Sequence, residues 1–135
     1  MNEATFFGYA SGTARGGVPS ARIAVYKVCW SGIGCRDADI LAGFDAAIAD
    51  GVDILSVSLG STYAEPYLEN SVAIGAFHAM RNGIFTSAAA GNSGPYLSTA
   101  SNVAPWLLSV GASTIDRNFS NKIILGNGMV FEVSL

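Results

Sequence analysis

Short hydrophobic runs alternate along the chain with turns rich in glycine and asparagine, and this pattern predicts alternating strands and helices. The run Arg22–Trp30 is rich in β-branched and aromatic residues, which predicts a first strand. Three later runs, each bounded by turn residues, predict further strands: Val52–Leu59, Ile84–Ala90 and Leu107–Ala112. Near the C-terminus, Gly126-Asn127-Gly128 separates two apolar runs, which predicts a β-hairpin formed by Ile123–Leu125 and Met129–Val133.

Two stretches between the predicted strands have helical spacing. Asp37 is predicted to cap a helix over Ala38–Asp50, which Gly51 ends. A second helix is predicted over Tyr67–Asn82, with Gly83 after its end. The residues predicted to face the core are Ile40, Leu41, Phe44, Ala47 and Ile48 in the first helix, and Leu68, Val72, Ala76, Phe77 and Met80 in the second.

Strands and helices that alternate at this spacing indicate right-handed βαβ units. The predicted fold class is therefore α/β, a parallel sheet flanked by helices, with a C-terminal β-hairpin. Residues 1–21 are rich in glycine and alanine and have no clear periodicity, so we expect a surface segment there.

Composition excludes several classes of function. Charged residues make up 13% of the chain, about half the usual share of about 25%, and the net charge is −3. With only seven Lys and Arg residues, a nucleic-acid partner is not expected. No apolar run reaches the length of about 18 residues that a membrane helix needs, and the N-terminus lacks the features of a signal peptide.

The stretch Ile84–Pro95, IFTSAAAGNSGP, combines a predicted buried strand with a tight loop. It places the amide of Asn92 at the carboxyl end of the strand, where open α/β sheets have their ligand sites. That position suits a hydrogen-bond donor to an oxyanion. A role for Asn92 in shaping the turn alone is the alternative, because asparagine is common in loops.

Four blocks of this sequence resemble the middle of a subtilisin-like serine protease, most closely the plant cucumisin-like branch. They are GTARGGVPSARIAVYKVCW, DADILAGFDAAIADGVDILSVSLG, GIFTSAAAGNSGP and APWLLSVGAST, and the resemblance covers residues 5–135. It implies that Asn92 is the oxyanion-hole asparagine. It also implies two groups of substrate-binding residues: Ser58, Leu59 and Gly60 as a backbone edge for the peptide, and Ala88, Ala89, Ala90 and Gly91 as a pocket wall.

The same resemblance implies a polypeptide substrate, no cofactor and a secreted parent protein of the cell wall or apoplast. The family's triad motifs, H-G-T-H around the histidine and G-T-S-M around the serine, do not occur in these 135 residues. His78 lies mid-helix without the expected glycine, and Ser93 has no base to activate it. We therefore expect residues 1–135 to be a partial peptidase domain without peptidase activity of its own.

Two cysteines, Cys29 and Cys35, lie six positions apart, a spacing that allows either a small disulfide loop or two free thiols. The resemblance to a secreted family favours the disulfide. Two cysteines without a nearby histidine are too few ligands for a metal site. Asn118 begins the sequon Asn118-Phe119-Ser120, a possible glycosylation site.

Two other functions fit parts of the pattern. The first is a peptide-binding module or pseudoenzyme that keeps the substrate groove without catalysis. The second is a nucleotide-binding doubly wound domain, which needs G-x-G-x-x-G between the first strand and the first helix. The loop Ser31–Arg36 contains only G-x-G, which argues against it. Sequence alone leaves the oligomeric state and the preferred substrate residues open.

Overall fold

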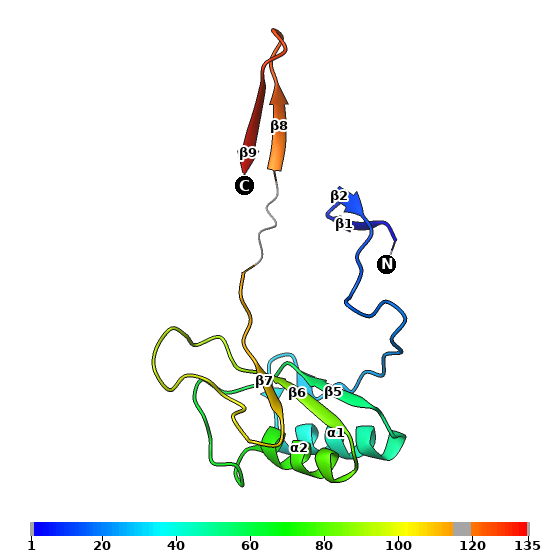
Figure 1. Cartoon of the computed structure of the whole chain (residues 1–135), viewed down its shortest axis with the longest axis vertical. Helices are drawn as coiled ribbons and strands as arrows, with labels where there is room; N and C mark the ends of the chain where they lie inside the picture. Colours follow the sequence, from blue (N-terminus) through cyan, green and yellow to red (C-terminus); the bar gives the residue numbers. More distant parts are fainter. Residues whose placement is uncertain (1, 115–119, 135) are drawn as a thin grey trace.

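The computed structural model describes residues 2–114 and 120–134. At its centre is a three-stranded parallel sheet in the order β5-β6-β7, formed by β5 (Ile54–Val57), β6 (Phe85–Ala89) and β7 (Leu108–Val110). The register pairs Val57 with Ala88, and Ala89 with Val110. Two helices, α1 (Asp37–Asp50) and α2 (Ser71–Arg81), cover one face of this sheet (Figure 1). The predicted α/β class with a parallel sheet and helices is confirmed, although each strand is shorter than predicted.

The ends of α1 match the prediction at one end only. Gly51 adopts the left-handed conformation (φ 69°), and its N–H faces the carbonyls of Ala47 and Ile48, as predicted for a glycine that ends a helix. The predicted cap at Asp37 is wrong. The helix already includes Asp37, and Arg36 occupies the capping position without a side-chain hydrogen bond. The carboxylate of Asp37 instead lies in the first turn, where the helix dipole favours negative charge.

The predicted start of the second helix is also wrong, by four residues. Residues 66–70 form a turn in which the N–H groups of Glu69 and Asn70 donate to the Pro66 carbonyl. The Asn70 side chain then accepts a hydrogen bond from the Ala73 N–H at 2.7 Å and so caps α2. Leu68, predicted to face the core, is consequently 88% exposed.

The core lies between the two helices and the sheet. Its buried residues are Ile40 and Phe44 of α1, Val72 and Ala76 of α2, and Ala88 of β6. A Cβ on Gly75 would lie 2.3 Å from the Phe44 ring, so the two helices approach closely at that glycine. Phe77 and Met80, also predicted to face the core, are 39% and 43% exposed. Phe77 packs instead edge-on against Trp106, with ring centroids 5.3 Å apart.

The predicted strand Arg22–Trp30 is largely wrong. Only its last two residues form a strand, β3 (Cys29–Trp30), which pairs with β4 (Gly34–Cys35) in a small hairpin outside the main sheet. Ile23 and Val25 are 85% and 84% exposed, and a groove of about 1280 Å³ separates residues 21–29 from β5 and α1. A β-prone sequence forms a strand only where a partner edge lies within hydrogen-bonding distance, and here it lacks one.

Two hairpins lie away from the main sheet in Figure 1. The C-terminal one, β8 (Ser120–Ile124) with β9 (Val130–Ser134), confirms the predicted hairpin around Gly126-Asn127-Gly128. The N-terminal one, β1 (Ala4–Phe6) with β2 (Tyr9–Gly12), was not predicted, because its sequence has no alternating pattern. Among the described residues, no helix is long and apolar enough to span a membrane.

Candidate functional site at the carboxyl edge of the sheet

The candidate site lies at the carboxyl ends of the three parallel strands, the end of the sheet that we call the carboxyl edge. The ladder between β5 and β6 stops at the pair Val57 and Ala88, and the chain continues into residues 58–60 on one side and 90–95 on the other. The two segments predicted to bind substrate therefore leave the sheet from neighbouring strands at the same edge. Open α/β sheets bind their ligands at such an edge.

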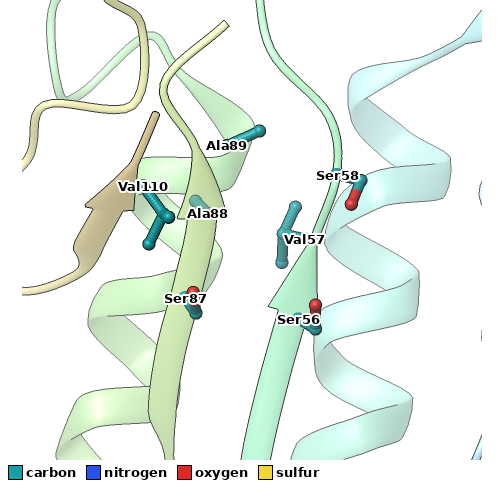
Figure 2. A pocket seen from close by; sticks show the side chains of 7 residues that line it. All are labelled: Ser56, Val57, Ser58, Ser87, Ala88, Ala89 and Val110. Atoms are coloured by element: carbon teal, nitrogen blue, oxygen red, sulfur yellow. The ribbon is translucent and has the colours of Figure 1, made fainter. Parts of the chain in front are cut away.

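A pocket of about 220 Å³ opens on the sheet next to this edge. Figure 2 shows its lining residues, which come from the three strands and, in the case of Ser58, from the residue just after β5: Ser56, Val57, Ser58, Ser87, Ala88, Ala89 and Val110. The lining thus includes Ser58, Ala88 and Ala89 from the predicted substrate-binding residues. Leu59, Gly60, Ala90 and Gly91 lie next to these residues along the chain but are not part of the lining.

Asn92 lies in the loop after β6, and its residue is exposed to solvent. Gly91, the residue before it, has φ +94°, a backbone angle that residues other than glycine rarely adopt, so the chain turns sharply there. Within the described residues, no hydrogen bond holds the Asn92 amide. That amide is free to donate to a ligand at the edge of the sheet.

A buried polar pair, Ser101 and Asn102, lies beneath both segments. These residues are only 1% and 5% exposed. The Asn102 Nδ2 donates to the Leu59 carbonyl at 2.6 Å and to the Ala89 carbonyl at 2.9 Å. The Ser101 N–H donates to the Ala90 carbonyl at 2.8 Å. One short segment therefore fixes the backbone that follows β5 and the backbone that follows β6.

Two glycines leave room for this pair. A Cβ on Gly60 would lie 2.6 Å from the Ser101 Oγ and 3.3 Å from the Asn102 Nδ2. A Cβ on Gly91 would lie 3.1 Å from the same Ser101 Oγ. Both glycines were singled out in the sequence as substrate-binding residues, and the structure gives each of them a packing reason to be glycine.

Sequence reasoning did not find Ser101 and Asn102. They lie in the stretch Thr99–Ala104, which has neither the periodicity of a helix nor the alternation of a strand. The one available signal is the dipeptide Ser101-Asn102 itself, since polar residues of this type between two apolar runs often bond to backbone. Which backbone they reach depends on the fold.

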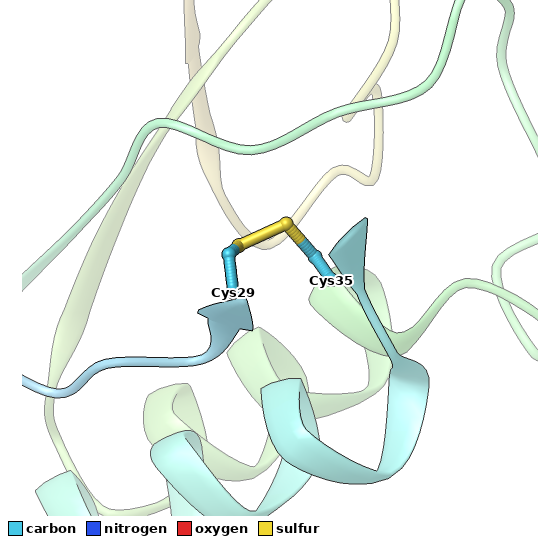
Figure 3. The surroundings of a disulfide bond; sticks show 2 residues. All are labelled: Cys29 and Cys35. Atoms are coloured by element: carbon cyan, nitrogen blue, oxygen red, sulfur yellow. A yellow bond between two sulfur atoms is a disulfide. The ribbon is translucent and has the colours of Figure 1, made fainter. Parts of the chain in front are cut away.

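The other predicted residues lie away from the edge or outside the described part. His78 is exposed on α2, and the described residues contain no group of three or more potential metal ligands. Cys29 and Cys35 are joined by a disulfide between β3 and β4, with an S–S distance of 2.02 Å (Figure 3). Asn118 falls in 115–119, outside the described residues. Ser93 is half-buried in the loop that carries Asn92.

The fold and this edge define a class of protein, an α/β domain with a parallel sheet. Small, uncharged residues lie at the carboxyl ends of its strands, together with the exposed amide of Asn92. The Subtilase family model matches residues 3–124 of this chain. The chain is 59% identical over 129 residues to Subtilisin-like protease SBT4.14 of Arabidopsis thaliana, and 54% identical over 133 residues to Subtilisin-like serine-protease S of Lotus japonicus. The matches cover 96% and 98% of this chain and 17% of each relative.

The chain therefore belongs to the subtilase family. It spans about a sixth of the length of the curated relatives that it matches. The predicted resemblance to plant subtilisin-like serine proteases is confirmed.

Proposed function

We propose that this chain forms the substrate-binding and oxyanion-stabilising part of a serine endopeptidase domain, with the catalytic triad supplied by residues outside these 135. The observation that carries the proposal is the exposed amide of Asn92, which has no hydrogen-bond partner among the described residues. It lies in the loop that leaves β6 at the same end of the sheet where residues 58–60 leave β5. When a serine attacks a peptide carbonyl, negative charge develops on the carbonyl oxygen. A donor aimed at that oxygen stabilises the transition state more than the ground state.

The substrate in this proposal is a polypeptide in extended conformation. Residues 58–60 follow the last paired residue of β5, so their backbone N–H and C=O groups are free to pair with a peptide, apart from the Leu59 carbonyl that Asn102 occupies. The small side chain of Ala89 leaves the adjoining pocket open, and a larger side chain there would fill it. Ala88 also lines the pocket, but its side chain belongs to the buried core.

The experiment needs a complete peptidase. We therefore define a grafted relative: SBT4.14 of Arabidopsis with the matching 129 residues replaced by those of this chain. A fluorophosphonate probe should label it at one site per molecule, and a peptide p-nitroanilide chosen for measurable turnover reports kcat and KM. The isolated 135-residue chain should remain unlabelled, because its single histidine, His78, lies exposed on α2 and its side chain bonds to no serine among the described residues.

In the grafted relative, Asn92→Leu keeps the approximate volume and deletes the donor. The general example for this type of donor is subtilisin itself, where its loss lowers kcat by about 10²–10³. We expect a decrease of that size in kcat per titrated site, with KM changed only a few-fold. Asn92→Leu with near-normal kcat would overturn the oxyanion assignment and leave Asn92 as a turn residue. Labelling of the isolated chain would contradict the absence of a nucleophile.

A second candidate is a peptide-binding module without catalysis, favoured by the absence of triad motifs from this sequence. Binding of a casein-derived peptide by the 135-residue chain, with no activity in the grafted relative, would favour it over the peptidase.

We further propose that the parent protein is secreted, since the disulfide Cys29–Cys35 suits an oxidising compartment. Two alkylatable thiols in the protein isolated from plant tissue would argue against secretion.

A further inference from the structure

We infer that Asn102 is a positioning residue whose amide sets the spacing between the substrate-pairing backbone after β5 and the oxyanion-donor loop after β6. This inference rests on the proposed function. The two hydrogen bonds of the Asn102 Nδ2 span 43 and 13 residues of sequence, to Leu59 and Ala89. Asn102 therefore connects two segments that are far apart in the chain and belong to different strands.

The bonds of Asn102 take the place of the sheet where the sheet stops. The register between β5 and β6 ends at the pair Val57 and Ala88. Two carbonyls just past this pair, those of Leu59 and Ala89, accept from the Asn102 amide instead. A single planar NH₂ group has a fixed angle between its two N–H bonds, so it holds the two carbonyl oxygens at a fixed separation.

The side chain fits this task at a cost to stability. Both acceptors are carbonyl oxygens, so only the NH₂ end of the amide can face them. The Asn102 Oδ1 is then buried, and it has no hydrogen-bond partner within the described part of the chain. The backbone also has φ +55°, in the left-handed region that asparagine tolerates better than most residues. Both features lower the stability that the two hydrogen bonds provide.

The hydrogen bonds of Asn102 link it to both proposed functional segments. On one side it holds the carbonyl of Leu59, the middle residue of the segment 58–60. On the other it holds Ala89, three residues before Asn92, while its neighbour Ser101 holds the Ala90 carbonyl. Movement of Asn102 would therefore shift the peptide-pairing segment and the oxyanion donor relative to each other. Misplacement of about 1 Å at such a site can cost about 10²-fold in rate.

The test compares two substitutions in the grafted relative. Asn102→Asp keeps the shape and tolerates the same backbone conformation, but it cannot donate two hydrogen bonds. Asn102→Gly keeps the backbone conformation and removes the amide. We expect each to lower kcat/KM by about 10–100-fold per titrated site, with kcat lowered and KM raised together. Asn92→Leu, in contrast, should lower kcat and leave KM nearly unchanged.

Combining the variants separates positioning from stability. In the Asn92→Leu background there is no donor left to misplace, so Asn102→Asp should no longer lower kcat and should still raise KM. The matched control is Asn82→Asp at the end of α2, which removes one amide-to-carbonyl bond, from Nδ2 to the His78 carbonyl at 2.8 Å. Asn82→Asp should leave kcat and KM per titrated site unchanged in both backgrounds.

The outcomes distinguish this inference from the proposed function. If Asn92→Leu lowers kcat but Asn102→Asp only lowers the melting temperature or the yield, the inference fails and the proposed function stands. Equal decreases in kcat for Asn102→Asp with and without Asn92→Leu would also overturn it. So would failure of both Asn102 variants to fold while Asn82→Asp folds, which would make Asn102 purely structural. If Asn92→Leu leaves kcat intact, the proposed function fails, and the inference with it.

Discussion

The helix-covered face of the central sheet and its carboxyl edge are built in opposite ways. The face is apolar and tightly packed, with Phe44 of α1 against Gly75 of α2 and Ala88 of β6 beneath the helices. The edge is lined by small residues and held by buried hydrogen bonds from Ser101 and Asn102. Burial of apolar area stabilises the face, although its Thr86 hydroxyl is buried without a partner among the described residues. The edge holds a larger polar group in that state, the amide oxygen of Asn102. We infer that packing on the face stabilises the fold, whereas the hydrogen bonds at the edge set the positions of the proposed substrate-binding segments.

The largest expected effect on this comparison comes from Gly60→Ala at the edge. The new methyl group would lie 2.6 Å from the Ser101 Oγ, so either the buried Ser101 side chain or the segment around Gly60 must shift. We expect kcat/KM of the grafted relative to fall by about 10–100-fold per titrated site, with little change in melting temperature.

Its control removes the atom that the new methyl group meets. In Gly60→Ala/Ser101→Ala the contact at 2.6 Å is gone and the Ser101 Cβ lies at 3.7 Å, an ordinary contact. The nearest atom is then the Asn102 Nδ2 at 3.3 Å, a tight contact that a shift of a few tenths of an ångström relieves. The double variant should recover most of the lost kcat/KM. Normal activity of the single variant Gly60→Ala would show that the edge tolerates movement, and would contradict the proposed difference between the edge and the helix-covered face.

The same substitution on the covered face, Gly75→Ala, should have the opposite signature. Its methyl group would lie 2.3 Å from the Phe44 ring, so the ring or the two helices must shift. Overpacking of this kind lowers the free energy of unfolding by about 1–3 kcal/mol. Chemical denaturation of the grafted relative measures that loss. The kcat and KM per titrated site should stay unchanged, and a decrease in kcat would show that the face also sets the geometry of the edge.

Features of these two regions could be predicted from the sequence where the interacting residues are close together along the chain. Helical spacing and a glycine at a helix end are local signals, so α1 and its end at Gly51 were predicted. Asn102 bonds to a residue 43 positions away, and nothing in its neighbourhood indicates that partner. The run Arg22–Val28 shows the converse. Its residues favour a strand, but a strand also needs an edge to pair with, which composition does not specify.

A smaller effect is expected from Thr86→Val on the covered side of β6. The Thr86 side chain is buried, with 1% exposure, and its hydroxyl has no hydrogen-bond partner in the described part of the chain. Valine has nearly the same shape and removes the unpaired group, so unfolding free energy should rise by about 1 kcal/mol. Ser87→Ala, on the next residue of the same strand, is the control for loss of a hydroxyl outside the core. A clear loss of stability in Thr86→Val would mean that the hydroxyl has a partner and that the face is not wholly apolar.

The smallest expected effect concerns the segment beside β5 that forms no strand. The Tyr26 hydroxyl donates to the Asp50 Oδ2 at 2.7 Å, connecting this segment to the end of α1. That hydrogen bond first, then partial desolvation and the negative charge of Asp50, raises the pKa of Tyr26 above its ordinary value of 10.0. A group whose pKa is raised on folding contributes stability below its unfolded pKa and loses it as the pH rises through the folded pKa.

The stability difference between the grafted relative and its Tyr26→Phe variant should therefore be constant near neutral pH. It should shrink above about pH 10, where the ionised phenol and Asp50 repel each other. Absorbance at 295 nm, taken as the difference between the two proteins, follows the ionisation of Tyr26 alone. Tyr96→Phe, at a side chain that is 78% exposed, is the control. If Tyr26 ionises at or below the pH of a free tyrosine, its hydrogen bond to Asp50 does not persist in solution, and residues 21–28 are not held to α1 by this contact.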